Sequence, residues 1–270
     1  MIKNYKWLFK YLSRGGRVMV IDFHVHGKIT KKFPFDEEKF LLMVKEAKEN
    51  GMNALAITEH LNANNFMEGY EFLKNNFNNF GDYYDIDGFK VFYGMEVTTK
   101  QDLDFLIIGN SKLVLELRNK IIENIKTDKF IDVNDLFKLN ISNELLVIWA
   151  HPYRNHSELP LLESYITEKL DALEVNSKDA YKFGKDEMQE KIYMLAKQLN
   201  LPIVKGSDTH YFIQISTAKN IFSKNCNTIK EIKEEIKTRN YSSEFSSELN
   251  VRVKSAKIIK DLICNKSNIL

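Results

Sequence analysis

Cysteine is scarce in this sequence: its two cysteines, Cys226 and Cys264, lie late in the chain without the spacing of a metal knuckle. Because disulfide frameworks are typical of small secreted domains, both are interpreted as reduced thiols. A run of eighteen apolar residues is also missing, which argues against a membrane span. The first residues contain neither the apolar region nor the small-residue cleavage site of a secretory signal. A cytoplasmic protein is therefore expected.

An excess of charge of one sign is missing as well. The chain has 39 basic and 37 acidic residues among 270, a formal net charge of +2, which does not suggest a general nucleic-acid binder. The basic residues are uneven, because residues 1–17 contain five of them and no acid. Solvated lysines are the commoner explanation of such an end, and contact with phosphates or a membrane surface is the alternative. We expect a basic extension at 1–17, one large domain at 18–240, and a loosely packed extension at 241–270.

What the sequence does have is a regular alternation of short apolar runs and longer amphipathic stretches, without internal repeats or a low-complexity linker. This alternation predicts a mostly parallel sheet with helices outside it. Strands are expected at Val18–Phe23, Asn53–Thr58, Lys90–Val97, Leu103–Gly109, Leu145–Ala150, Leu170–Asn176 and Pro202–Lys205. Helices are expected at Asp36–Asn50, Phe66–Asn79, Leu113–Lys126, residues 179–199 and Thr228–Thr238, with a shorter one after Asp132.

Five of the six histidines follow directly from the ends of expected strands. The segments that contain them or neighbouring acids are IDFHVH, AITEH, GMEV, IWAHPYR and VKGSDTH. Closed barrels place their chemistry at the carboxyl ends of the strands, so these side chains are expected to converge on one rim. They are His24, His26, Glu59, His60, Glu96, His151, Asp208 and His210.

The spacing of these residues suits metal binding. Residues i and i+2 of an extended segment point to the same side, so His24 and His26 can reach one ion, and so can Asp208 and His210. Imidazoles and carboxylates suit Zn, Mn or Fe, and the absence of nearby cysteine argues against a structural thiolate site. Each motif alone could be a pair of polar surface residues, or a turn histidine that hydrogen-bonds to a backbone carbonyl. It is the joint occurrence of the motifs that favours a metal site. His156, in a loop, is interpreted as a solvated side chain.

In this order, the segments DFHVH, ITEH, GMEV, AHPYR and GSDTH resemble the motifs of the PHP (polymerase and histidinol phosphatase) domain family. The resemblance covers roughly residues 18–240. It implies a distorted (β/α)7 TIM-like barrel that holds up to three divalent ions and hydrolyses phosphate esters.

The resemblance also implies roles for individual residues. His24, His26, Glu96 and Asp208 would bind one ion; Glu96 would bridge to a second ion held with His151; His60 and His210 would serve a third. Asp22 would orient a ligand imidazole, and Glu59 would do the same or bind directly. The family's extra ligand after the HxH segment is missing from GKITKKFPFD, and its histidine after Glu96 is replaced by DLDFLIIG, with Asp102 and Asp104. Two ions are therefore expected, and the third site is incomplete.

The function expected from this resemblance is metal-dependent phosphoesterase activity with metal-activated water, on a small phosphorylated substrate or a short nucleic acid. Arg154 is the candidate for binding the phosphate, with a surface salt bridge as the alternative, and Lys28 and Lys205 are weaker candidates. A catalytically degenerate barrel that acts as a structural or regulatory module is the second hypothesis, motivated by the two missing ligands. Hydrolysis of a carbon–nitrogen bond ranks last, because no lysine lies where a carboxylated bridging ligand would be expected.

Overall fold

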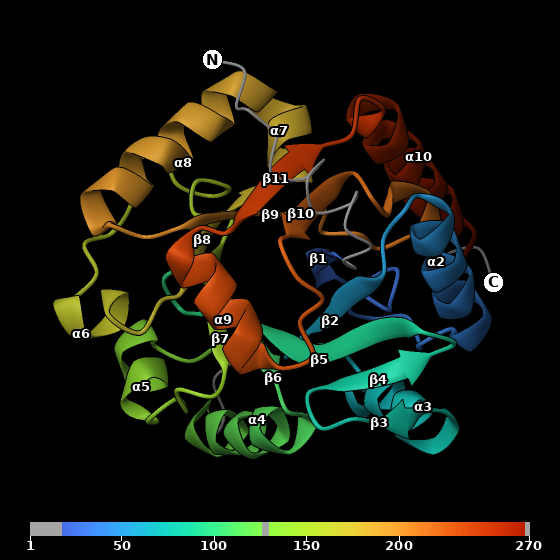
Figure 1. Cartoon of the computed structure of the whole chain (residues 1–270), viewed down its shortest axis with the longest axis horizontal. Coiled ribbons are helices and arrows are strands. Elements are labelled where there is room, and N and C mark those ends of the chain that lie inside the picture. The colour runs from blue at the N-terminus through green and yellow to red at the C-terminus, as the bar shows by residue number, and fades with distance from the viewer. Residues whose placement is uncertain (1–17, 126–129, 268–270) are drawn as a thin grey trace.

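The sheet of this protein curves into a nearly closed barrel, as Figure 1 shows for the computed structural model, which describes residues 18–125 and 130–267. The strand order is β11-β10-β1-β2-β5-β6-β7-β8-β9, and a short β3–β4 hairpin extends from β5. The mixed α/β barrel confirms the fold expected from the sequence. The strands are β1 (Met19–Val25), β2 (Ala54–His60), β3 (Asn78–Asn79), β4 (Tyr83–Ile86), β5 (Phe89–Thr98), β6 (Asp104–Gly109), β7 (Leu146–Ala150), β8 (Ala172–Asn176), β9 (Ile203–Gly206), β10 (Ala218–Phe222) and β11 (Tyr241–Phe245).

The sheet is mixed rather than mostly parallel as expected, because β10 pairs antiparallel with β1 and β11 and because β6 interrupts the parallel strands. β1, β2 and β5 are parallel neighbours, and so are β7, β8 and β9. β6 lies between these two groups and pairs antiparallel with both β5 and β7. The short connection after β5 explains this, because a few residues suffice to join antiparallel strands, whereas a parallel pair needs a crossover.

Helices surround the barrel and cover its outer face (Figure 1). Their apolar sides pack on outward-facing strand residues, which gives the larger of two core clusters. The helices around the barrel are α2 (Glu37–Glu49), α3 (Met67–Asn76), α4 (Ser111–Ile125), α5 (Val133–Lys138), α6 (Ser164–Thr167), α7 (Ser177–Phe183) and α8 (Lys185–Leu199). The single helix expected over residues 179–199 is two helices, because Gly184 adopts a φ of 102° between α7 and α8.

The smaller core cluster fills the barrel interior. Inward-facing strand residues such as Phe23, Phe92 and Leu106 pack there with Ile232 and Ile236 of α9 (Ile229–Thr238). In Figure 1, α9 crosses the barrel at one end. The amphipathic pattern that predicted a surface helix at 228–238 therefore buries its isoleucine side against the interior of the barrel.

The C-terminal part is ordered, contrary to the loosely packed extension expected from its polar sequence. β11 pairs antiparallel with β10, and α10 (Leu249–Ser267) follows it. Leu249 and Val253 of α10 belong to the main core, and Ala256 is also buried. These apolar residues recur every three to four positions, a helical signal that the serine-rich stretch before them obscured.

None of the helices in the described ranges is long and apolar enough to span a membrane. The two cysteines are both free thiols. The basic N-terminal segment expected at residues 1–17 lies outside the described residues.

Candidate metal centre

The ligand-type side chains named from the sequence converge on one rim of the barrel, although they are up to 186 positions apart. His24 and His26 come from β1, His60 from the end of β2 and Glu96 from β5. The remaining ligand candidates, His151, Asp208 and His210, follow β7 and β9 directly. Four overlapping groups of three ligand atoms each lie within 4.8 Å: His26/His60/His210, His24/His151/Glu174, His24/His26/Glu96 and Glu96/Asp104/His151.

The first part of this cluster is built on the HxH segment. His24 Nε2 lies 3.2 Å from His26 Nε2 and 3.6 Å from Glu96 Oε1. Asp208 Oδ1 lies 3.3 Å from His26 Nε2. All four side chains are buried. The set assigned to one ion by family resemblance is therefore compact.

The second part joins Glu96 to His151, whose Nε2 lies 3.0 Å from Glu96 Oε1. On the other side of the imidazole, His151 Nδ1 lies 3.7 Å from Asp104 Oδ2. Asp104 on β6 thus lies close to the second group of ligands, for which this sequence lacks the histidine that the family has after Glu96. Asp102, the other acid of that segment, lies in the turn before β6 with a φ of 56°.

The third part consists of three stacked imidazoles. The ring of His26 lies 4.1 Å from that of His210 and 4.3 Å from that of His60, between ring centroids. His60 Nδ1 lies 2.6 Å from Glu96 Oε2, and His210 Nδ1 is 2.9 Å from the carbonyl of Lys28. The Lys28 ammonium turns away from the cluster to Glu68 and to the carbonyls of Asn64 and Asn65, so it is not placed to bind a phosphate there.

The charges of the cluster favour cation binding. Burial by itself would raise the pKa of Glu96, but the neighbouring His60 and His24 hold it well below its usual range. Burial likewise opposes ionisation of Asp208, and the charges of Lys178 and Arg154 outweigh it, so that this pKa is also well below its ordinary value. Both carboxylates are thus anionic across the physiological range.

The histidines of the cluster differ in the direction of their pKa shifts. Burial would lower the pKa of His24, but the carboxylates of Glu174, Asp208 and Glu96 raise it well above its ordinary value. Burial lowers the pKa of His60 to about 4, so its ring is neutral at pH 7, the form that binds metals.

Several atoms of this buried cluster lack a hydrogen-bond partner within the described chain. They are His26 Nδ1, His60 Nδ1 and Glu96 Oε2, which make ion-pair contacts but no hydrogen bond of good geometry. Buried polar atoms are rarely left unpaired, because desolvation without a partner costs roughly 1–3 kcal/mol each. Lone pairs on nitrogen and carboxylate oxygen fit a divalent ion, so the residues present suit a metal.

Backbone strain is concentrated at the same place. His151 has a φ of 32° and Asp208 a φ of 54°, both in the left-handed region that residues with a side chain seldom adopt. Each follows the end of a barrel strand and turns its side chain toward the cluster. Conformations of this kind cost on the order of 1–3 kcal/mol and are typical of functional sites.

Glu174 is a functional candidate that the sequence analysis missed. Its Oε1 lies 2.9 Å from His24 Nδ1, and its Oε2 accepts a hydrogen bond from the His151 backbone at 3.0 Å. It therefore orients one imidazole and positions the residue that bears another. Gly206 leaves room for it, since a Cβ there would collide with the Glu174 carboxylate. Its position in the sequence was one indication. Glu174 lies two residues before Asn176 in β8, so the two side chains point to the same side at the carboxyl end of the strand.

The two acids expected to support ligands differ in their contacts. Asp22 accepts hydrogen bonds from the backbone N–H groups of His24 and Ser207, both at 3.1 Å. It therefore holds the backbone at these two residues and does not orient an imidazole ring. Glu59 Oε1 lies 3.5 Å from His26 Nδ1, as expected of a carboxylate that orients this ring.

Arg154 reaches the cluster from the loop after β7. Its Nε donates to Asp179 Oδ1 at 2.9 Å, and its Nη1 donates to Asp208 Oδ2 at 2.7 Å. Its Nη2 is buried and has no hydrogen-bond partner among the described residues. His156 is half-buried, and its Nε2 lies 3.2 Å from the carbonyl of Asp102, outside the cluster. Lys205 contacts the carbonyl of Ser243 and the ring of Phe245, also away from the cluster.

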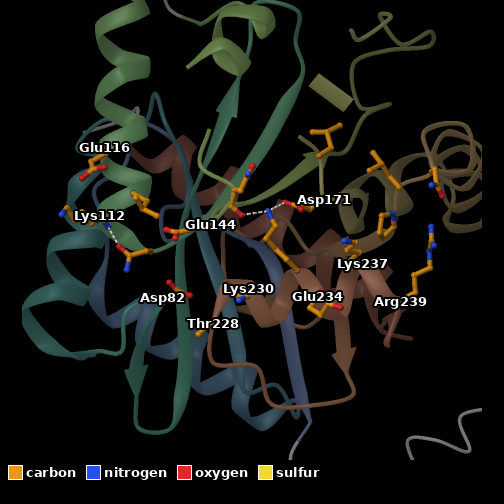
Figure 2. A pocket seen from close by; sticks show the side chains of 18 residues that line it. Asp82, Lys112, Glu116, Glu144, Asp171, Thr228, Lys230, Glu234, Lys237 and Arg239 are labelled. Carbon is orange, nitrogen blue, oxygen red and sulfur yellow. Dashed lines mark hydrogen bonds and ion pairs between the residues drawn. The ribbon is translucent and has the colours of Figure 1, made fainter. Parts of the chain in front are cut away.

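A large surface hollow lies at the other end of the barrel, beside the segments that lead into β7, β8 and β9. It encloses about 1310 Å³ and is lined by charges of both signs, among them Lys230, Glu234 and Lys237 of α9 (Figure 2). Lys233 and Asp171 pair across it at 3.0 Å. None of the ligand groups found in the described chain lies there, so the hollow is not part of the candidate centre.

Comparison with known proteins agrees with the geometry. A family model described as the PHP domain matches residues 22–248. No curated protein matches the chain. The crystal structure of PsfC from Pseudomonas syringae PB-5123 is similar, with a TM-score of 0.73 and 21% identity over 92% of this chain and 99% of that one.

Two endonuclease structures share the fold over part of their length. The lesion-specific endonuclease PfuEndoQ from Pyrococcus furiosus has a TM-score of 0.61 and 20% identity over 82% of this chain and 56% of that one. An Endonuclease Q complex with a 27-mer duplex that contains an abasic lesion has a TM-score of 0.59 and 19% identity, over 82% and 57%. The chain spans just over half of these endonucleases, and identities this low establish the fold alone.

Proposed function

The chain belongs to the PHP domain family, and from this premise we propose that it is a metal-dependent phosphoesterase that uses the buried histidine and carboxylate cluster. The observation that carries the proposal is the convergence of ligand atoms from seven strands, or from the loops that follow them, into groups within 4.8 Å. Scattered structural histidines would not meet at one rim.

We propose two ions as the working composition. The first would be held by His24, His26, Glu96 and Asp208, and the second by Glu96, His151 and Asp104. The stacked His26, His60 and His210 form the candidate third site, which lacks the extra ligand of the HxH loop. The mixed nitrogen and oxygen donors suit Zn, Mn or Fe. Divalent ions in such a site supply Lewis acidity and lower the pKa of water from about 15.7 to roughly 7.

Arg154 is the residue that we expect to bind the phosphate. Asp179 and Asp208 fix its guanidinium, which leaves the buried Nη2 without a partner and able to donate to an added oxygen. Guanidinium groups recognise phosphate oxygens through charge-assisted hydrogen bonds of fixed geometry. The substrate would be a small phosphorylated compound or the phosphorylated end of a short nucleic acid.

The test combines metal analysis with a substrate panel. Elemental analysis of the purified protein is expected to give at least one tightly bound transition metal per chain. Phosphate release should be measured with added manganese on sugar phosphates, amino-alcohol phosphates and short 5′-phosphorylated oligonucleotides. We expect turnover on at least one class, and His24→Ala or Asp208→Ala should reduce it by roughly a thousandfold or more.

His156→Ala is the matched control, because it removes a half-buried histidine outside the cluster. Circular dichroism should show that all three variants keep the fold. Wild-type turnover in His24→Ala would show that the active centre lies elsewhere. Less than one metal per chain would favour the alternative of a degenerate barrel with a structural or regulatory role.

A further inference from the structure

Lys178 is a cation beside the candidate metal centre that the sequence analysis did not identify. It lies in the first turn of α7, directly after β8. Its Nζ donates to Asp208 Oδ1 at 2.7 Å, while Arg154 Nη1 donates to Asp208 Oδ2 at 2.7 Å. Each oxygen of one carboxylate therefore contacts a cation, one from the loop after β7 and the other from helix α7.

The two cations differ from the ligand candidates in their exposure. The side chain of Lys178 is 30% exposed and that of Arg154 is 24% exposed, whereas Asp208 is 3% and His24 0% exposed. Lys178 and Arg154 thus lie on the solvent side of the buried cluster. An anion that reaches the cluster from solvent would meet them first.

The contacts of Lys178 leave its charge available to a ligand. Asp208 is the one carboxylate within ion-pairing distance of Lys178 in residues 18–125 and 130–267, whereas Arg154 also contacts Asp179. A divalent ion held by Asp208 would take up much of the charge of this carboxylate, because a bound ion is the largest local charge in such a site. Lys178 would then need another anionic partner.

The surroundings of Lys178 add positive charge. The C-terminal helix α10 packs against α7, and it begins one residue beyond the end of the family match. It contributes Lys260, whose positive charge acts on Lys178 together with that of Arg154. Like charges at close range repel, and a bound anion would relieve this repulsion.

We propose that Lys178 binds the phosphoryl group of the substrate together with Arg154, so that the guanidinium of Arg154 and the ammonium of Lys178 hold different phosphoryl oxygens. This inference rests on the proposed phosphoesterase function and adds a second phosphate-binding residue to it. Arg154 supplies planar, directional donors, while Lys178 supplies a compact charge on a flexible stem. The alternative is that Lys178 only holds Asp208 in place for a metal.

Inorganic phosphate is the probe that separates the two roles. Its binding to the manganese-loaded protein is measured by calorimetry, in parallel with the manganese affinity of each variant. Lys178→Met is expected to raise the Kd for phosphate by roughly tenfold or more, since charged hydrogen bonds of this kind contribute factors of this size. Lys178→Arg should stay within about threefold of wild type because it keeps the cation.

Lys191→Met is the matched control, because Lys191 pairs with Glu187 on the exposed side of α8. Manganese is kept at ten times the Kd measured for each variant, so that any loss of metal affinity does not mask phosphate binding. Unchanged phosphate affinity in Lys178→Met would overturn the proposal, whether or not manganese binds more weakly. If the wild type binds phosphate through Lys178 but turns over no ester of the panel, the phosphoesterase function fails and this assignment stands.

Discussion

At the scale of single residues, Glu174 connects two of the candidate ligands. One of its oxygens contacts the ring of His24, and the other accepts the backbone N–H of His151, which lies in a strained conformation. Carboxylates in this position fix the tautomer and the orientation of a ligand imidazole, and raise its basicity. A side chain that binds no ion directly can therefore set the geometry of the site.

We predict that Glu174→Gln weakens the first metal site without unfolding the barrel. Glutamine keeps the shape and one hydrogen bond to His24 but removes the charge that raises the pKa of this histidine. Metal affinity should fall by about 10- to 100-fold, the usual cost of removing such a partner. Competition with a chromogenic chelator measures it, and Glu187→Gln, an exposed change on α8, serves as control. Wild-type affinity in Glu174→Gln would show that His24 needs no such support.

At the scale of secondary-structure elements, side chains help to close the barrel at the seam between β9 and β1. Asn220 of β10 accepts from the N–H of Lys205 at 2.9 Å and donates to the carbonyls of Lys205 and Ile21 at 2.7 and 3.2 Å. It thereby links β9 to β1, which the backbone ladders leave unpaired in the strand order. Tyr241 adds a contact from β11 to the carbonyl of Ile203 at 2.7 Å.

Asn220→Ala is expected to destabilise the whole barrel. The change leaves buried backbone groups of Lys205 and Ile21 without partners, which should lower the free energy of unfolding by roughly 2–4 kcal/mol. Urea denaturation followed by fluorescence measures the loss. Asn124→Ala provides the comparison, because its exposed side chain donates within α4 alone and should cost under about 1 kcal/mol. Equal stabilities of the two variants would mean that Asn220 does not close the seam.

At the scale of the whole molecule, the candidate centre joins parts of the chain that are distant in sequence. The proposed ligands come from β1, β2, β5, β6 and the loops after β7 and β9. An ion bound there would cross-link most of the barrel at one end. Because such an ion binds the folded chain and not the unfolded one, it would stabilise the fold by mass action.

Removal of metal should therefore lower Tm, and the difference should depend on pH. At 100 times the Kd of the metal the stabilisation is about 2.7 kcal/mol, which corresponds to roughly 5–10 °C. The pKa of His24 is raised, so a proton competes with the ion for its ring below that pKa, while Glu96 and Asp208 stay charged. The stabilisation should be full at high pH and shrink as pH falls.

Differential scanning calorimetry with and without chelator, at pH 8 and pH 6, measures this difference. The gap in Tm between the loaded and the chelated protein is expected to be smaller at pH 6. His24→Ala should show a smaller gap at both pH values. A gap that widens toward acid pH would contradict the assignment of His24 as a ligand.

The sequence by itself determined the order of most strands and helices and the kinds of atoms at the rim. The apolar periodicities that identify β1, β2 and α2 are local, and so are the motifs that place His24, Glu96 and Asp208 at strand ends. Because the carboxyl ends of barrel strands meet at one rim, local position was enough to predict their convergence.

Only the tertiary structure decided which partners these residues have. Glu174 contacts His24 across 150 positions, and Lys178 contacts Asp208 across 30, with no local pattern that relates them. The ordered α10 and the Asn220 seam also depend on surfaces that other elements provide. Such contacts arise from packing between distant segments, and the periodicity of a single segment does not contain that information.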